Sequence, residues 1–382
     1  MTIPICKPHL PEAAQYAEDL AEIFASGQLT NGRLVRTLEE RVAARLGVDS
    51  VVAFSSATTG LMLAMKTLGE PGDEVLLPSF TFPATIQAVV WAGLKPRLVD
   101  CDPETFNVTA ETVARALTPR SRFLIPVYVF GAPPRWDLLG PLAEREGLTV
   151  VSDAAHALGS TWEGRPVGGM AAAEIFSLAP TKLLVAAEGG LAATNDRALS
   201  DRLRLARNHG NSGDYVCNPG GLNGRMSELH ALLALKGLPG LDGQIRRRQE
   251  LWGFYRRNLN GVPGISFQKL PWQATSTWNY IGLRFDPEAF GATAAGLQQR
   301  LAERGIESRR YFHPPLHVQE SFQPVLDRED RTFPGTDRLV SEILCLPIWS
   351  DLGEGGVGRV TDEVRSFHAS ARRLAGPSGD RP

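Results

Sequence analysis

Short apolar, β-branched runs alternate with stretches of helical spacing from about residue 50 onward. Apolar residues recur at helical spacing over residues 59–68, 81–92 and 136–146. The strand-like runs are "SVVAFSS", "DEVLLPS", "KPRLVD", "RFLIPVYVF", "LTVVSDA", "AAEIFSL" and "LAATN". Such alternation predicts an α/β fold in which a mostly parallel, seven-stranded sheet is covered by helices on both faces.

The pattern changes at "DGQIRRRQELWGFYRRNLN", residues 242–260, which has the spacing of a long, arginine-rich amphipathic helix. Fewer strand-like runs follow it. We therefore expect a large domain over residues 1–245 and a smaller α+β domain over residues 246–375 that ends in a helix at 357–374. The last residues, "GPSGDRP" at 376–382, predict a flexible tail.

Composition narrows the function classes. The 382 residues include 40 Lys and Arg against 42 Asp and Glu, so the net charge of −2 gives no positive field for nucleic acid or an anionic membrane. The four cysteines have no paired spacing, which argues against a metal site or a disulfide framework. The first residues, "MTIPICKPHL", lack a basic region followed by an apolar stretch. We expect a cytoplasmic protein without a metal ion.

Ligands of open parallel sheets bind at the carboxyl ends of the strands. Lys182 follows one strand in "EIFSLAPTK", and a buried lysine is costly unless its amine is deprotonated or covalently used. Asp153 ends another strand in "VVSDAAHALGS", where its carboxylate needs a partner. That partner is either an arginine or the protonated ring nitrogen of pyridoxal phosphate. The two residues are 182 − 153 = 29 positions apart, so both side chains could meet at one rim.

Other strand ends carry weaker signals. In "SSATTG", Ala57 and Thr58 open a helix whose N-terminus suits a phosphate, although Thr58 alone is also a normal N-cap. Phe82 in "PSFTFPAT" is either a core residue or a ring that stacks on a flat cofactor, and His156 is either structural or a cofactor donor. A Schiff-base lysine, an aspartate for the ring nitrogen and a phosphate cup together form the protein's share of pyridoxal phosphate chemistry.

The order and spacing of several segments resemble the DegT/StrS-type sugar aminotransferases, which are fold-type I pyridoxal phosphate enzymes. The resemblance covers nearly the whole chain, and it is strongest to nucleotide-linked 4-keto-6-deoxysugar 4-aminotransferases in "SATTGL", "DAAHALG" and "GGLNGRMSE". The other segments are "SGQLTNGRLVRTLEERVAARLGV", "PGDEVLLPSFTFPAT", "LVDCDPETFNV", "FSLAPTK", "EGGLAATND", "RNHG" and "YFHPPLH".

The resemblance implies roles for individual residues. Lys182 would carry the cofactor as a Schiff base, and Asp153 would hold the ring nitrogen protonated. A homodimer with shared active sites is implied, in which Asn223 of the neighbouring chain reaches the phosphate. The remaining cofactor contacts would be Ala57, Thr58, Phe82, His156 and Ser177, and the substrate side would be lined by Tyr311, His313 and His317.

The chain departs from the family pattern at a few positions. Ala57 stands where many relatives have glycine, which is tolerable if the backbone there has a negative φ. Leu178 and Ala179 replace an aromatic residue and a histidine before the lysine, and Ala187 replaces a glycine of a "GEGG" pattern. These positions bear on the substrate, whereas the catalytic set is complete.

The implied reaction moves an amino group from L-glutamate or L-glutamine to a nucleotide-linked keto-deoxysugar, at C4, in antibiotic or surface-sugar biosynthesis. Arg309 and Arg310 could meet the acceptor's diphosphate. Two alternatives use the same cofactor residues: an amino-cyclitol (inosose) aminotransferase, and a regulator that binds the cofactor without turnover. A family dehydratase would have histidine in place of Lys182. A dinucleotide-dependent oxidoreductase should show G-x-G-x-x-G, which "SSATTG" does not supply.

Overall fold

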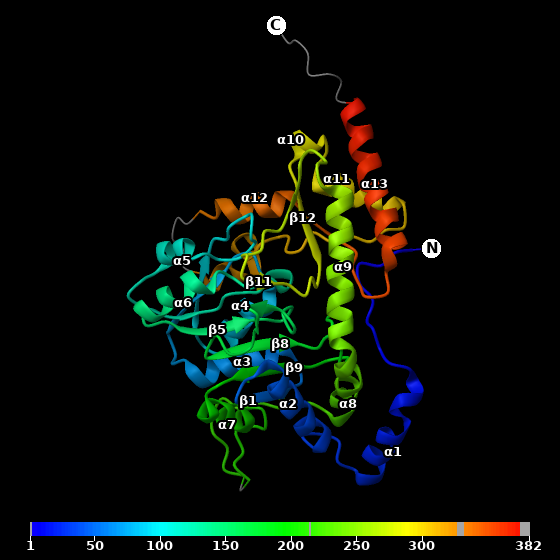
Figure 1. Ribbon diagram of the computed structural model, residues 1–382. Helices are drawn as coiled ribbons and strands as arrows, with labels where there is room; N and C mark the ends of the chain where they lie inside the picture. Colours follow the sequence, from blue (N-terminus) through cyan, green and yellow to red (C-terminus); the bar gives the residue numbers. More distant parts are fainter. Residues whose placement is uncertain (1, 214, 327–331, 375–382) are drawn as a thin grey trace.

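Figure 1 shows the computed structural model, which describes residues 2–213, 215–326 and 332–374. The predicted flexible tail, residues 376–382, lies outside the described residues. All seven predicted strands are present in one sheet of order β1-β9-β8-β5-β4-β2-β3. These strands are β1 Ser50–Phe54, β2 Glu74–Pro78, β3 Lys95–Val99, β4 Ser121–Leu124, β5 Thr149–Asp153, β8 Ala173–Ser177 and β9 Gly190–Thr194.

The sheet is mostly parallel, which confirms the prediction. β9 runs antiparallel to its two neighbours, β1 and β8, and the successive pairs from β8 to β3 are parallel. β4 is shorter than the predicted run "RFLIPVYVF", because it ends at Leu124. Pro126 follows without an N–H to donate to a neighbouring strand, and Phe130 has a φ of 57° that no extended strand adopts.

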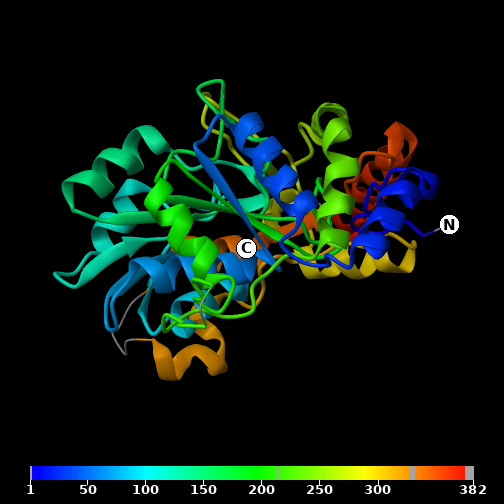
Figure 2. The ribbon, with the colours of Figure 1, turned by 90° about the horizontal axis from the view of Figure 1, so that it is seen from below.

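Helices cover both faces of the sheet (Figure 2). Successive strand residues point to opposite faces, so Val51 and Ala53 of β1 join one hydrophobic core while Val52 and Phe54 join the other. Helices α2, α5, α6 and α8 cover the first core, and α3, α4 and α7 cover the second. The helices of this part are α1 Ala17–Ser26, α2 Arg33–Leu46, α3 Ala57–Leu68, α4 Pro83–Trp91, α5 Ala110–Ala116, α6 Trp136–Arg145, α7 Arg197–Ala206 and α8 Glu228–Gly237.

A smaller C-terminal unit is built on a three-stranded antiparallel sheet of order β10-β12-β13. A further small sheet has the order β11-β6-β7. β6 and β7 precede β8 and β9 in the sequence, whereas β11 follows them. The elements are β6 Thr161–Trp162, β7 Arg165–Pro166, α9 Leu241–Leu259, β10 Ile265–Phe267, β11 Ala274–Thr275, β12 Ile281–Phe285, α10 Pro287–Phe290, α11 Ala294–Glu303, α12 Pro334–Glu342, β13 Ile343–Leu346 and α13 Gly353–Leu374.

The predicted arginine-rich helix is α9, which runs beside both units (Figure 1). Its Ile245 packs into the core of the large sheet, whereas its Leu251 packs into the core of the C-terminal unit. The start of the chain also lies against the C-terminal unit, since Ile3 joins that core and pairs with Ile306. The predicted division at residue 245 therefore falls within a helix that both cores share.

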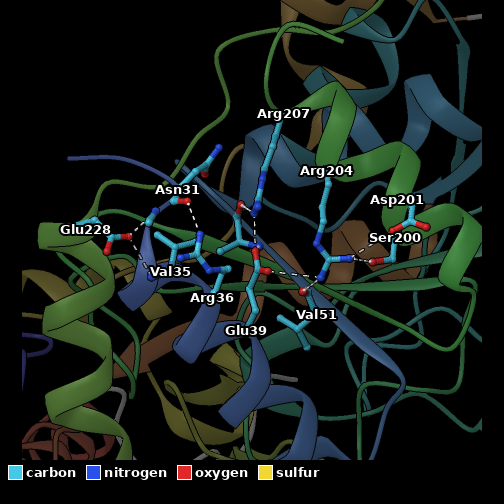
Figure 3. A network of polar contacts seen from close by, with 12 residues as sticks. Asn31, Val35, Arg36, Glu39, Val51, Ser200, Asp201, Arg204, Arg207 and Glu228 are labelled. Carbon is cyan, nitrogen blue, oxygen red and sulfur yellow. Dashed lines mark hydrogen bonds and ion pairs between the residues drawn. The ribbon is translucent and has the colours of Figure 1, made fainter. Parts of the chain in front are cut away.

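β1 lies at an edge of the sheet, where backbone groups lack a neighbouring strand, and side chains satisfy them (Figure 3). The N–H of Ala53 donates to Glu39 Oε1 at 2.9 Å, and its carbonyl accepts from Arg207 at 2.6 Å. Arg204 donates to the carbonyl of Val51 at 3.1 Å. Glu39 forms ion pairs with both arginines. This network fixes the strand that leads into α3.

We expect Glu39→Ala to lower the free energy of unfolding by about 3–5 kcal/mol, the range for removing one member of a buried ion pair. The buried guanidinium of Arg207, which is 6% exposed, would lose its ionic partner. Urea unfolding measures the change, and Glu40→Ala on the exposed side of the same helix is the control. Equal unfolding free energies for the two variants would show that the network does not hold the edge strand.

Candidate active site

A cavity of about 360 Å³ lies where the carboxyl ends of β5 and β8 meet the first turns of α3 and α4. Open α/β sheets place their ligand sites at this position. The structure brings most of the predicted residues together around it. The predicted residues that line the cavity are Ala57, Thr58, Phe82, Asp153, His156, Ser177, Lys182 and Tyr311.

Lys182 lies in the loop between β8 and β9. A hydrogen bond from the N–H of Leu178 to the carbonyl of Gly189, at 2.9 Å, closes the base of this loop. Burial lowers the pKa of Lys182 to about 8, and the negative charge of Asp153 offsets only part of this effect. The amine therefore loses its proton far more readily than an ordinary lysine does, which a nucleophile or a base requires.

Asp153 is the last residue of β5 and is 6% exposed. Burial raises the pKa of its carboxyl, whereas hydrogen bonds from Thr85 Oγ1 at 2.8 Å and from the N–H of Ala155 at 3.2 Å lower it. Within the described part of the chain, no arginine forms an ion pair with Asp153. Of the two partners that the sequence left open, the structural arginine is not found among the residues that the structure describes. A buried carboxylate on the cavity wall suits a cationic group of a ligand.

The first turn of α3 forms a second wall of the cavity. Its N-cap is Ser56 rather than Thr58, and Ser56 Oγ accepts from the N–H of Thr59 at 3.1 Å. The N–H groups of Ala57 and Thr58 have no partner within the helix, because they belong to its first residues. Ser177, at the end of β8, lies on the same cavity. Free amides, hydroxyls and the helix dipole together suit a phosphate.

His156 and Phe82 present aromatic rings to the cavity. The ring of His156 stacks on Phe130 with centroids 6.3 Å apart, and it meets the ring of Tyr280 edge-on at 5.6 Å. Burial lowers the pKa of His156 well below its usual value, so the imidazole is neutral. Phe82 caps α4 and is 58% exposed, so one of the alternatives, a ring buried in the core, is not found.

Three predicted residues lie outside the cavity lining. Asn223 is exposed in the loop before α8, and His313 is exposed in the segment that follows Tyr311. His317 is held by two side chains: Nδ1 lies 2.7 Å from Ser79 Oγ, and Nε2 lies 3.0 Å from Asp337 Oδ1. Both ring nitrogens of His317 are thus engaged within the chain.

Sequence reasoning missed Tyr280 and Arg248. Tyr280 lines the cavity from the segment before β12, and its ring lies 4.9 Å from that of Tyr311. Arg248 of α9 is 2% exposed and donates to the carbonyls of Trp278 and Asn279, at 3.3 and 3.1 Å, just before this tyrosine. No sequence motif marks Tyr280 as a cavity residue. The sequence shows Arg248 only as one of several arginines in a charged helix.

Within residues 2–213, 215–326 and 332–374, no group of three or more His, Cys, Asp or Glu side chains is placed to hold a metal ion. Over the same residues, no helix combines the length and the apolar character that a bilayer crossing demands.

The depressed pKa of Lys182 predicts how its reactivity depends on pH. In the cofactor-free protein, labelling of Lys182 by an amine-directed reagent should rise with pH around a midpoint of about 8, because only the neutral amine reacts. Peptide mapping by mass spectrometry measures the labelled fraction. In urea, the midpoint should move toward the ordinary lysine value of about 10.4. A midpoint that is the same in the folded and unfolded protein would mean that the site does not perturb the amine.

Comparison with known proteins identifies the family. Residues 12–365 match the DegT/DnrJ/EryC1/StrS aminotransferase family. The chain is 30% identical over 362 residues to the dTDP-4-amino-4,6-dideoxy-D-glucose transaminase of Escherichia coli, an alignment that covers 94% of this chain and 97% of that relative. The crystal structure of DesI in the presence of its TDP-sugar product matches with 34% identity and a TM-score of 0.90, covering 99% of this chain and 96% of that one. DesV of S. venezuelae, in complex with a ketimine intermediate, matches with 31% identity and a TM-score of 0.85, covering 95% of this chain and 98% of that one.

The matched region contains the whole cavity described above, from α3 to Tyr311. The predicted fold and cofactor are confirmed, since aminotransferases of this family depend on pyridoxal phosphate and share this α/β architecture. The chain belongs to the DegT/DnrJ/EryC1/StrS aminotransferase family and is a pyridoxal phosphate-dependent aminotransferase.

Proposed function

We propose that this enzyme moves an amino group from L-glutamate or L-glutamine to C4 of a nucleotide-linked keto-deoxysugar. The observation that carries the proposal is that Lys182 and Asp153 line one cavity beside a helix N-terminus suited to a phosphate. The nucleotide-linked acceptor is supported by similarity to a dTDP-sugar transaminase and to DesI, whose structure was determined with a TDP-sugar product.

The cavity fits the cofactor at both of its ends. The first amides of α3 and the hydroxyls of Thr58 and Ser177 would hold the phosphate. At the other end, the carboxylate of Asp153 would accept a hydrogen bond from the ring nitrogen. No arginine among the described residues pairs with this carboxylate, which leaves it available for this cation. When bound, pyridoxal phosphate supplies an electron sink that stabilises negative charge at the carbon next to the transferred nitrogen.

The side chains of this chain would do the remaining work. Lys182 would bind the cofactor covalently at rest and, once released, would carry a proton at Nζ, for which a pKa of about 8 is suitable. Neutral His156 would contact the phenolic oxygen of the cofactor, and the exposed ring of Phe82 would stack on the pyridine ring.

The acceptor would enter past the segment from Arg309 to His313. Tyr311 lines the cavity, and the cationic Arg309 and Arg310 lie next to it in the chain, where a diphosphate would need a positive partner. His317 would act indirectly, because Ser79 and Asp337 already engage its ring. Its contribution would be to anchor this segment on the strand end after β2.

We infer that the enzyme is a homodimer in the cytoplasm and that it serves antibiotic or surface-sugar biosynthesis. Asn223 is exposed and lies outside the cavity of its own chain. This placement fits a role at a second copy, where the partner subunit's Asn223 would reach the cofactor phosphate.

Sedimentation equilibrium tests the dimer, and Asn223→Ala should weaken cofactor retention if the residue acts across that interface.

The phosphate cup depends on the close approach of β9 to α3. A Cβ at Gly190 would overlap the backbone of Ser56 and Ala57. The alanine methyl group would push the first turn of α3 away from β9. We therefore expect Gly190→Ala to weaken pyridoxal phosphate binding by at least about 10-fold, which corresponds to about 1.4 kcal/mol of binding free energy. Fluorescence titration measures the dissociation constant. Gly140→Ala, in open space within α6, is the control and should bind normally. Normal binding by Gly190→Ala would argue against the cup.

Product analysis tests the proposed reaction. The purified enzyme is supplied with pyridoxal phosphate, L-glutamate or L-glutamine, and either a TDP-linked 4-keto-6-deoxysugar or a keto-cyclitol. Mass spectrometry and NMR of the product should show an amino group at C4 of the sugar. An amine on the cyclitol alone would favour the amino-cyclitol aminotransferase. Cofactor binding without any transfer from either donor would favour a regulatory protein.

A further inference from the structure

The hydroxyl of Thr85 is directed at the carboxylate of Asp153. Thr85 lies in the first turn of α4 and is fully buried, and its Oγ1 donates to Asp153 Oδ2 at 2.8 Å. Threonine hydroxyls in helices commonly bond the carbonyl three or four residues earlier. Here the hydroxyl instead bridges from a helix to the end of β5, so it serves the carboxylate rather than its own helix.

A second buried threonine lies within hydrogen-bond distance of Thr85. Thr81 Oγ1 lies 2.8 Å from Thr85 Oγ1 and is 1% exposed. An ionised carboxylate can only accept, so the proton of Thr85 points to Asp153 and the proton of Thr81 points to Thr85. The two threonines can therefore serve an ionised Asp153 as successive donors.

The ionised state needs this support because the carboxylate is buried. Burial raises the pKa of Asp153, and Thr85 heads the contributions that lower it, followed by the N–H of Ala155 and the charge of Lys182. The contribution of Lys182 exists only while its amine is free and protonated. The two hydrogen bonds do not depend on that amine, and the one from Thr85 is the shorter.

We propose that Thr85 is a positioning residue that keeps Asp153 ionised and oriented toward the cavity, and that it acts on the cofactor ring nitrogen through Asp153. This inference rests on the proposed role of Asp153 in holding that nitrogen. Thr81 supports Thr85 by donating to its hydroxyl, which leaves the proton of Thr85 committed to the carboxylate.

The experiment compares Thr85→Val, Thr85→Ser and wild type, each loaded with pyridoxal phosphate labelled with ¹⁵N at the ring. Thr361→Val is the control, because Thr361 is also a buried helical threonine but donates to the carbonyl of Gly358 in α13. The ¹⁵N chemical shift reports whether the ring nitrogen is protonated, and equilibrium dialysis gives the dissociation constant of the cofactor. If Thr85→Val does not fold, Thr85→Ala replaces it, since alanine removes the hydroxyl without placing a methyl group against the carboxylate.

We expect Thr85→Val to shift the ring nitrogen signal toward the unprotonated form and to lower kcat by about 10- to 100-fold, the range for a lost hydrogen bond to a charged group. Thr85→Ser keeps the hydroxyl, so its ring nitrogen signal and its kcat should match those of wild type. Thr361→Val should change neither the signal nor kcat. A protonated signal with unchanged kcat in Thr85→Val, or a failure of Thr85→Ser to restore the signal, would overturn the inference. Wild type that does not bind the cofactor would instead contradict the proposed function.

Discussion

Lys182→Ala should reduce the rate of amino transfer by about 10⁴-fold, the upper end of what one positioned proton-transfer group contributes. Lys182 would both bind the cofactor covalently and carry a proton at Nζ, and no other lysine lies between residues 114 and 224 to replace it. Its lowered pKa of about 8 suits both tasks. Steady-state kinetics measures the loss, and borohydride reduction followed by peptide mapping shows whether the cofactor is attached to this lysine.

The control distinguishes loss of chemistry from loss of binding. Lys182→Ala should still retain pyridoxal phosphate without covalent attachment, since the α3 cup and Asp153 are unchanged. Lys95→Ala, at an exposed position that begins the edge strand β3, should behave as wild type. Substantial turnover in Lys182→Ala, or an adduct trapped on a different lysine, would refute the role of Lys182.

Asp153→Asn should lower kcat by about 10²- to 10³-fold, similar to the loss of one preorganised electrostatic group in an active site. Asparagine keeps the shape of the side chain but removes the charge that would hold the ring nitrogen protonated. At the same time, the variant should be as stable as wild type or more stable. Burial raises the pKa of Asp153, so ionising this carboxylate near neutral pH opposes folding, and the substitution removes that cost.

Kinetics and urea unfolding, made on the same preparation, test both halves of this prediction. Asp137→Asn is a matched control, because Asp137 forms a surface ion pair with Arg135 and does not line the cavity. A variant at Asp153 that loses activity and also becomes much less stable would indicate a structural aspartate. A fully active variant would show that the ring nitrogen does not need this charge.

The sheet could be predicted from sequence because each buried strand is a short apolar run, and the same reading placed Asp153 and Ser177 at strand ends. Prediction from the sequence failed where the role of a residue depends on contacts with segments far away in the chain. Nothing in the sequence around Glu39 indicates that it covers the edge of β1, and nothing near Tyr280 indicates that it reaches the cavity. The end of β4 was missed because a proline was read as part of an apolar run.

Two departures from the family pattern have different structural consequences. Ala57 begins α3 and is absent from the positive-φ positions of the described chain, so alanine is tolerated there, as expected from sequence. Ala187 has a φ of 63°, in the left-handed region that costs a non-glycine residue about 1–2 kcal/mol. The sequence flagged this position as a missing glycine but could not give its backbone conformation.

The most direct test of the central claim is the visible absorbance spectrum of the purified protein with pyridoxal phosphate, recorded before and after L-glutamate is added. We predict the band of a lysine-bound cofactor, which disappears as glutamate converts the cofactor to its pyridoxamine form. The spectrum is recorded both below and above about pH 8, the pKa of Lys182. If the band is absent at every pH, the assignment of Lys182 is contradicted and, with it, the proposed aminotransferase site.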